Sequence, residues 1–147
     1  EGQADYFATS KCLPRLFEQV SKRTPEKGDR RLKALVKKSE GKVLKKICNG
    51  EICQRVALAS LSVARMFKTI QNVSKDPQLS KRANFEVYQT RYKHPKPQCR
   101  LDTYMAGYKC KDHRELNVDD EDAAVGFCSY EDKNASRPRC WFHPERY

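Results

Sequence analysis

The fold is decided by residues 51–73, which read EICQRVALASLSVARMFKTIQNV. The apolar residues of this stretch recur at spacings of three and four, which is the period of one face of an α-helix. The other face carries Gln54, Arg55, Ser62, Arg65 and Lys68. The pattern therefore predicts an amphipathic helix with one stripe against a core. That predicted stripe consists of Ile52, Val56, Ala59, Val63, Met66, Phe67 and Ile70.

Two further helices are predicted before this stretch. Ser10 suits the N-cap of a helix that runs to about residue 23, and residues 24–28, TPEKG, are typical of a turn. Asp29 suits the N-cap of a second helix, which Asn-Gly at positions 49–50 would end. Gly41 weakens the middle of that second helix by about 1 kcal/mol relative to alanine, so we expect a kink or a break there.

The chain after residue 73 is less regular. We expect a short helix over residues 78–84, a short strand over 85–92 and a boundary at 94–97, HPKP. No long periodic segment follows, although the acidic residues 119–124 favour a helix start. The sequence predicts a mainly α protein with a three- to four-helix bundle in residues 1–97. A cysteine-rich, mostly irregular segment, residues 98–147, is expected to pack on that bundle as part of one structural unit.

Seven cysteines point to an oxidising compartment, so a secreted or periplasmic protein is predicted. We expect at least two disulfides, one joining Cys12 to Cys48 or Cys53 and at least one among the last four cysteines. An odd number leaves one thiol over, which allows a disulfide-linked dimer. No apolar run approaches the length of a membrane span. The candidates for disulfides are Cys12, Cys48, Cys53, Cys99, Cys110, Cys128 and Cys140.

An alternative role for four of these positions is zinc binding. Cys110 with His113 and Cys140 with His143 form two Cys-x-x-His pairs, and four such ligands satisfy tetrahedral zinc. The sequence contains no glycine-rich phosphate loop, no Gly-x-Ser-x-Gly elbow and no His-Glu-x-x-His motif. Outside the zinc alternative it therefore predicts no metal and no cofactor, and it leaves open whether the protein is an enzyme.

The net charge of +11 is unevenly distributed along the chain. Residues 1–97 hold 22 Lys and Arg against 9 Asp and Glu, whereas residues 98–147 hold 8 against 10. A basic body favours a polyanionic partner, such as an anionic glycan, a cell wall, a lipid surface or a nucleic acid. The plain alternative is a solvated lysine-rich surface that keeps the protein soluble. The predicted polyanion-binding residues are Lys37, Lys38, Lys42, Lys45, Lys46, Arg55, Arg65 and Lys68.

Two other functions are weighed against polyanion binding. One is a small glycan or cell-wall hydrolase with paired carboxylates, for which the candidate acids are Glu18, Glu40, Glu51 and Glu86. The other is a zinc-containing module that binds nucleic acid. Aromatic residues near the C-terminus are interleaved with Arg137, Arg139 and Arg146, a mixture that can stack sugars or bases. Phe127 and Trp141 are instead predicted to form a small core.

Overall fold

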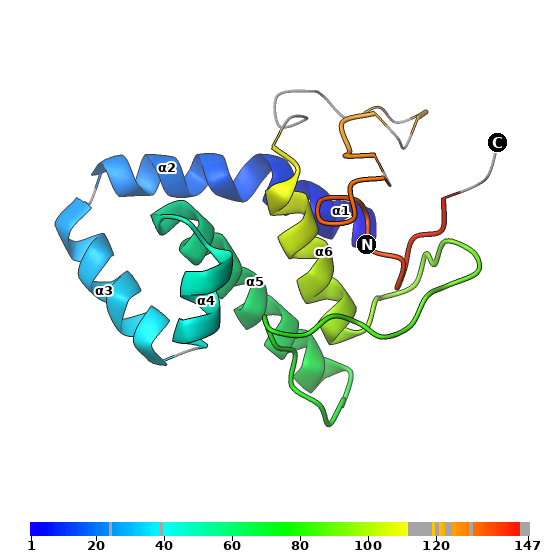
Figure 1. Ribbon diagram of the computed structural model, residues 1–147, viewed down its shortest axis with the longest axis horizontal. Helices are drawn as coiled ribbons and strands as arrows, with labels where there is room; N and C mark the ends of the chain where they lie inside the picture. Colours follow the sequence, from blue (N-terminus) through cyan, green and yellow to red (C-terminus); the bar gives the residue numbers. More distant parts are fainter. Residues whose placement is uncertain are drawn as a thin grey trace.

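The computed structural model describes residues 1–23, 25–38, 40–111, 119, 121–122, 125–129 and 131–144. These residues form helices joined by loops, with no strand among them, so the prediction of a mainly α fold is confirmed (Figure 1). The elements are α1 (Gly2–Phe7), the short π-helix η1 (Ala8–Cys12), α2 (Leu13–Arg23), α3 (Pro25–Lys38), α4 (Gly41–Ile47), α5 (Glu51–Ile70) and α6 (Pro97–Lys109). None of the described helices has both the length and the apolar composition that a membrane crossing requires.

Helix α6 is the central helix of the molecule. It packs against α5 on one side and against α1 and η1 on another, while α3 and α4 form the far end (Figure 1). Nearly every residue from Pro97 to Gly107 is buried, including Arg100, Asp102 and Thr103. Because α6 has almost no solvent-facing side, its polar and apolar residues do not separate into two stripes. The part of the chain after residue 97 has no amphipathic periodicity, yet it begins with this helix before it becomes irregular.

The buried face of α5 differs from the predicted stripe. Met66 and Ile70 are 51% and 67% exposed, although both were expected to face the core. Small side chains take part in the burial instead, and Leu61 packs in the main core with Leu101 and Met105 of α6. A pattern based on large apolar residues misses such a face because Ala and Ser carry little apolar signal. The buried residues of α5 are Cys53, Val56, Ala57, Ser60, Leu61 and Ala64.

The N-terminal helices begin earlier than predicted. The helical run starts at Gly2, and the Ser10 hydroxyl donates to the carbonyl of Phe7 at 3.3 Å instead of capping a helix. Helix α3 starts at Pro25 rather than at Asp29, since proline suits the first position of a helix. The expected break at Gly41 is confirmed, because α3 ends at Lys38 and α4 begins at Gly41.

The connection over residues 71–96 contains neither the predicted helix at 78–84 nor the predicted strand at 85–92. Side chains of α6 hold it in place: Asp102 accepts from the N–H of Ala83, and Gln98 donates to two carbonyls of the connection. The N–H of Val87 donates to the carbonyl of Arg139 at 2.9 Å, and the N–H of Arg91 donates to the carbonyl of Trp141 at 2.8 Å, but these backbone bonds do not make a ladder. At Asp119 the carboxylate accepts from two N–H groups in a turn, and the rest of the expected helix start at 119–124 lies largely outside the described residues.

Three disulfides hold the fold, and the predicted bridge from Cys12 to Cys48 or Cys53 is not among them. Cys48 and Cys53 flank the α4–α5 turn with Cα atoms 5.2 Å apart, so they bond to each other, and Cys12 is an exposed free thiol. The expected bridges among the last four cysteines are confirmed. They are Cys99–Cys140 and Cys110–Cys128, and both tie residues 125–144, called the C-terminal segment from here on, back to α6 or its end.

Phe127 and Trp141 occupy core positions, as predicted, but they belong to two separate clusters and do not form one small core. Both side chains are buried, and Phe127 packs against the ring of Tyr6 with centroids 5.1 Å apart. The indole N–H of Trp141 donates to the Thr103 hydroxyl of α6 at 2.9 Å. The C-terminal segment is therefore attached to α6 by aromatic packing as well as by sulfur.

Candidate functional site

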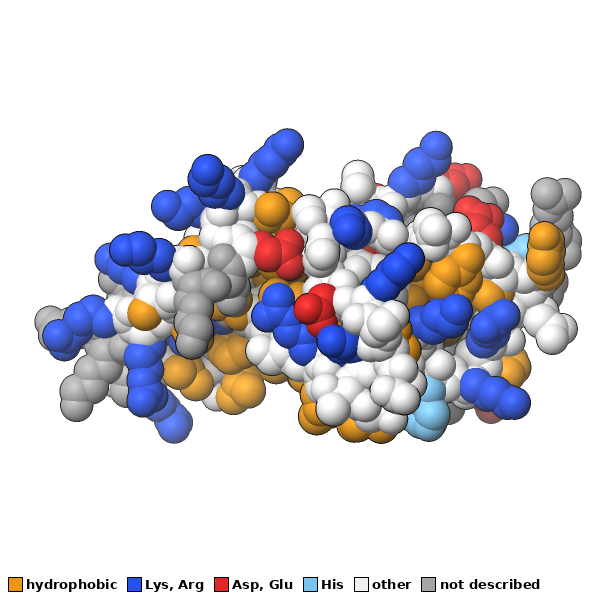
Figure 2. Space-filling model, turned by 90° about the horizontal axis from the view of Figure 1, so that it is seen from below, with side chains coloured by type: hydrophobic (Ala, Val, Ile, Leu, Met, Phe, Trp, Pro, Cys, Tyr) orange, Lys and Arg blue, Asp and Glu red, His pale blue; other side chains and the backbone are white. Residues whose placement is uncertain are grey.

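Four of the predicted polyanion-binding residues gather on α3 and α4. Lys42, Lys45 and Lys46 surround the buried Leu44 on α4, and Lys37 follows the buried Val36 on α3. All four lysine side chains are exposed, and none has an ion-pair partner among the described residues. We call Lys37, Lys42, Lys45 and Lys46 the α3–α4 lysine surface. Basic side chains crowd this end of the molecule, at the left of Figure 2.

The other predicted residues are engaged elsewhere. Arg55 donates to Glu51 at 2.7 Å, and Lys68 pairs with Asp76 at 2.8 Å. Arg55 and Arg65 line a cavity of about 340 Å³ between α2, α3 and α5, beside Leu35. Lys38 ends α3, but its side chain lies outside the described residues. The structure thus places Lys37, Lys42, Lys45 and Lys46 on α3 and α4, and it places Arg55, Arg65 and Lys68 on α5.

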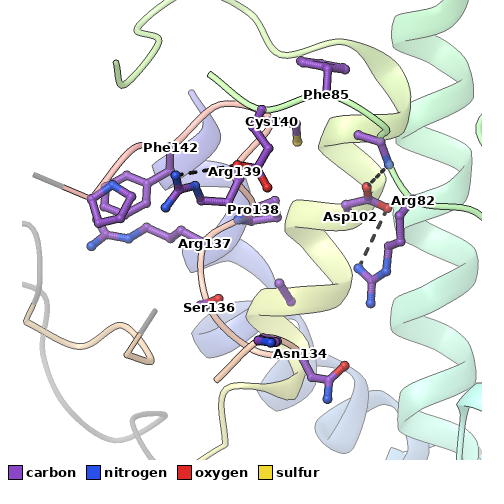
Figure 3. Close-up of a pocket in the computed structure, with 15 residues that line it drawn as sticks. Arg82, Phe85, Asp102, Asn134, Ser136, Arg137, Pro138, Arg139, Cys140 and Phe142 are labelled. Atoms are coloured by element: carbon purple, nitrogen blue, oxygen red, sulfur yellow. Dashed lines mark hydrogen bonds and ion pairs between the residues drawn. The ribbon is translucent and has the colours of Figure 1, made fainter. Parts of the chain in front are cut away.

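A cavity with a volume of about 540 Å³ lies at the other end of the molecule (Figure 3). Its floor is α6, and its walls come from residues 82–86 and 133–144. This volume is in the range of small-molecule sites. We call it the arginine cleft and define it by Arg82, Phe85, Asp102, Arg137, Arg139 and Phe142.

Arg137 packs against two aromatic rings in one wall of the arginine cleft. Its guanidinium lies 3.7 Å from the ring centroid of Phe142 and 4.9 Å from that of Phe127. Burial lowers the pKa of Arg137, but an arginine side chain remains charged in proteins. The Cys99–Cys140 bond ties the same wall to the floor helix. The cleft is therefore preformed by stacking and by a covalent link.

Asp102 forms the acidic floor of the cleft. One carboxylate oxygen accepts from the Ala83 N–H at 2.6 Å, and the other accepts from Gln98 at 3.1 Å. Arg82 pairs with the same carboxylate at 3.9 Å. Burial raises the pKa of Asp102 above its ordinary value of 3.8. Since both oxygens bind groups of the protein, Asp102 holds the wall at residues 82–83 against α6.

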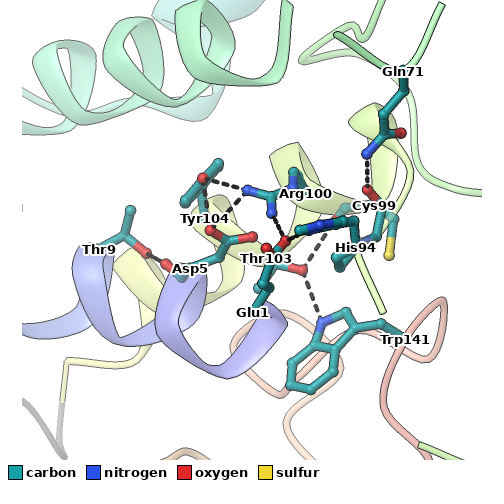
Figure 4. A network of polar contacts seen from close by, with 11 residues as sticks. Glu1, Asp5, Thr9, Gln71, His94, Cys99, Arg100, Thr103, Tyr104 and Trp141 are labelled. Atoms are coloured by element: carbon teal, nitrogen blue, oxygen red, sulfur yellow. Dashed lines mark hydrogen bonds and ion pairs between the residues drawn. The ribbon is translucent and has the colours of Figure 1, made fainter. Parts of the chain in front are cut away.

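A second polar cluster is buried beside α1 (Figure 4). Arg100, with a side chain only 4% exposed, pairs with Glu1 and with Asp5, and Tyr104 donates to Asp5 at 2.8 Å. The Arg100 guanidinium also lies 3.6 Å from the ring centroid of Phe67 on α5. Burial raises the pKa of Asp5 even though the positive charge of Arg100 lies beside it. These contacts join α1, α5 and α6. The residues of the cluster line neither of the two cavities described above.

The four candidate hydrolase acids hold different parts of the structure. Glu40 accepts from the Leu79 N–H at 3.1 Å, Glu51 binds Arg55, and Glu86 pairs with Arg139 at 3.7 Å. Glu18 is exposed on α2. No two of the four share a partner among the described residues, and Glu86 alone of them lines the arginine cleft.

The zinc alternative requires thiolates that the structure does not provide. Cys110 and Cys140 are bonded to Cys128 and Cys99, and a disulfide sulfur is not the thiolate ligand that zinc takes. His113 lies outside the described residues. Within the described part of the chain, no group of three or more His, Cys, Asp or Glu is placed to hold a metal ion.

Sequence reasoning missed the cleft as a site but noted part of it. The interleaving of Arg137 and Arg139 with aromatic residues was the available signal, and the structure brings Arg82 and Asp102 to the same place. Comparison of the chain with protein-family models, curated proteins and solved structures found no match.

Proposed function

We propose that the protein binds a polyanion through the α3–α4 lysine surface. The observation that carries the proposal is the exposure of four lysines on two consecutive helices, none with an ion-pair partner among the described residues. Residues 11–47 around them hold 13 Lys and Arg against 4 Asp and Glu. Like charges held close together repel, and a bound polyanion relieves that repulsion while it releases counterions.

The setting that we propose is outside the cytoplasm. Three intramolecular disulfides are compatible with an oxidising compartment, where such bonds persist. In that setting the polyanion is an anionic glycan, a cell-wall polymer or a lipid surface. The disulfides keep the helices in place while the lysines stay exposed to such a partner.

Heparin, a sulfated glycan, is a suitable probe. We expect binding at low salt that weakens steeply as salt rises, because exposed charges are screened. The variant K37Q/K42Q/K45Q/K46Q should bind heparin about tenfold more weakly, with a shallower dependence of log affinity on log salt. Affinity is measured by titration at several salt concentrations.

The matched control changes net charge by the same amount elsewhere. Lys75, Lys81, Lys93 and Lys111 are exposed, and K75Q/K81Q/K93Q/K111Q also lowers the net charge from +11 to about +7. The control should keep most of the affinity. Equal losses in the two variants would contradict the assignment to α3 and α4, and no binding of the unmodified protein at low salt would contradict the function itself.

A further inference from the structure

Among the described residues that line the arginine cleft, basic side chains outnumber acidic ones. Arg82, Lys133, Arg137 and Arg139 line it against two acids, Glu86 and Asp102. The ion pairs with these two acids do not use the N–H donors of Arg82 and Arg139 in hydrogen bonds. Arg82 reaches Asp102 at 3.9 Å and Arg139 reaches Glu86 at 3.7 Å, so these are ion pairs without a hydrogen bond.

The two arginines therefore have N–H donors to offer to a ligand. Neither Arg82 nor Arg139 makes a side-chain hydrogen bond among the described residues. Both are about half exposed, and exposed ion pairs of this kind are weak, so an incoming oxyanion displaces them at little cost. Figure 3 shows Arg82 on one side of the cleft and Arg137 and Arg139 on the other.

The walls define the rest of the ligand. The guanidinium fork matches the two oxygens of a carboxylate or a phosphate. Phe85, Phe142 and Pro138 line the cleft with apolar side chains that can contact a ring, and Asn134 and Ser136 bring polar side chains that suit hydroxyls. A bare inorganic ion would leave most of the 540 Å³ unused.

We propose that the arginine cleft binds a ring-shaped organic anion, namely a sugar unit that carries a carboxylate or a phosphate. Arg82 and Arg139 bind the oxyanion, Arg137 adds a fixed positive charge, and Phe142 carries the ring. The site shares no residue with the α3–α4 lysine surface, so it does not depend on the function proposed above.

Calorimetric titration of the full chain tests the site with four probes. Glucuronate and glucose 6-phosphate carry a ring with an oxyanion, glucose lacks the anion, and inorganic phosphate lacks the ring. We expect saturable binding of at least one of the first two, and the stronger one identifies the oxyanion. Glucose should not bind, and inorganic phosphate should bind at least about tenfold more weakly.

Variants locate the binding. R82Q and R139Q should each weaken it about tenfold, because each removes one charge-assisted contact from a partly exposed position. The matched control R30Q/R65Q removes two exposed arginines outside the cleft and should leave binding unchanged. R137K keeps the charge but loses the planar stack between two rings, so it should also weaken binding. Thermal unfolding of each variant reports whether it is folded.

The outcomes separate this site from the polyanion proposal. K37Q/K42Q/K45Q/K46Q should bind the sugar anion as the unmodified protein does. Binding of neither sugar anion at millimolar concentration, or unchanged binding in folded R82Q and R139Q, would overturn the proposal. Glucose binding as tightly as glucuronate would remove the anion requirement, and phosphate binding as tightly as glucose 6-phosphate would remove the ring requirement; either result overturns the stated ligand class.

Discussion

Asp5 and Asp102 are buried acids that join segments distant in sequence. Asp5 binds Arg100 and Tyr104 of α6 from α1, and Asp102 holds the backbone at Ala83 to α6. Burial raises the pKa of both carboxyls even though each has an arginine nearby. Their ionised forms are therefore held at a cost in stability, and what each one contributes is the attachment of one particular segment.

Replacing Asp102 by asparagine tests that cost. A folded-state pKa above the ordinary 3.8 means that the stability contributed by the protonated acid is present below pH 3.8 and is lost as pH rises through the folded pKa. The difference in free energy of unfolding between the unmodified protein and D102N should therefore fall between pH 3 and pH 7. Urea unfolding at several pH values measures it.

Asp76 provides a control of opposite sign. The hydrogen bond and charge of Lys68 lower the pKa of the Asp76 carboxyl at the surface. The stability that Asp76 contributes is thus present above pH 3.8 and is lost as pH falls. The difference between the unmodified protein and D76N should rise slightly with pH. If the difference in free energy of unfolding between the unmodified protein and D102N also rises with pH, burial is not the main influence on the pKa of Asp102.

At the scale of the elements, the contact between α1 and α6 depends on one missing side chain. A Cβ atom at Gly107 would lie 2.5 Å from the Thr9 hydroxyl oxygen and closer still to the carbonyl oxygen of Tyr6. Backbone and a buried hydroxyl form that obstacle, so a flexible side-chain tip cannot move aside. The absence of a side chain at Gly107 is what lets α6 approach α1 closely.

The variant Gly107→Ala should consequently lower the free energy of unfolding. Alanine favours a helix by about 1 kcal/mol over glycine, but overpacking typically costs about 1–3 kcal/mol, and the obstacle here is backbone. We expect a net loss of about 1–2 kcal/mol in urea unfolding. Ser62→Ala, at an exposed position of α5, is the control and should be near neutral. A G107A protein as stable as the unmodified one would mean that α1 and α6 separate easily.

At the scale of the whole molecule, covalent links join the C-terminal segment to the helices. Cys99–Cys140 spans 41 positions and Cys110–Cys128 spans 18, whereas Cys48–Cys53 spans only 5. A disulfide that closes a longer loop removes more freedom from the unfolded chain. The link between α6 and the wall of the arginine cleft is therefore the one with the largest expected effect.

Removing the bridges one at a time tests this order. In the chain-entropy model C99A/C140A should lose about 4 kcal/mol and C48A/C53A about 2 kcal/mol. Cys12→Ala should change little, because Cys12 is exposed and unpaired. Thermal unfolding measures the three variants. Alkylation of the native protein should modify one thiol, at Cys12; a second reactive thiol, or a larger loss in C48A/C53A than in C99A/C140A, would contradict the pairing.

The sequence by itself determined the features that rest on local chemistry. Helix α5 was expected at residues 51–73 and spans Glu51–Ile70, and the break before Gly41 is present. An amphipathic stripe and a glycine act over a few residues, so they can be recognised without knowing the fold. The concentration of lysines along α3 and α4 is visible in the sequence for the same reason.

Only the tertiary structure decided the rest. Helix α6 is buried on nearly every side, which removes the periodic pattern by which helices are recognised. The partner of Cys48 depended on the distance across a turn, and the arginine cleft depended on bringing Arg82 and Arg139, which are 57 positions apart, to line one cavity. Such contacts arise when α6 and the Cys99–Cys140 bond draw distant segments together. The energy of each such contact depends on two segments together, so the residue pattern of one segment alone does not predict the contact.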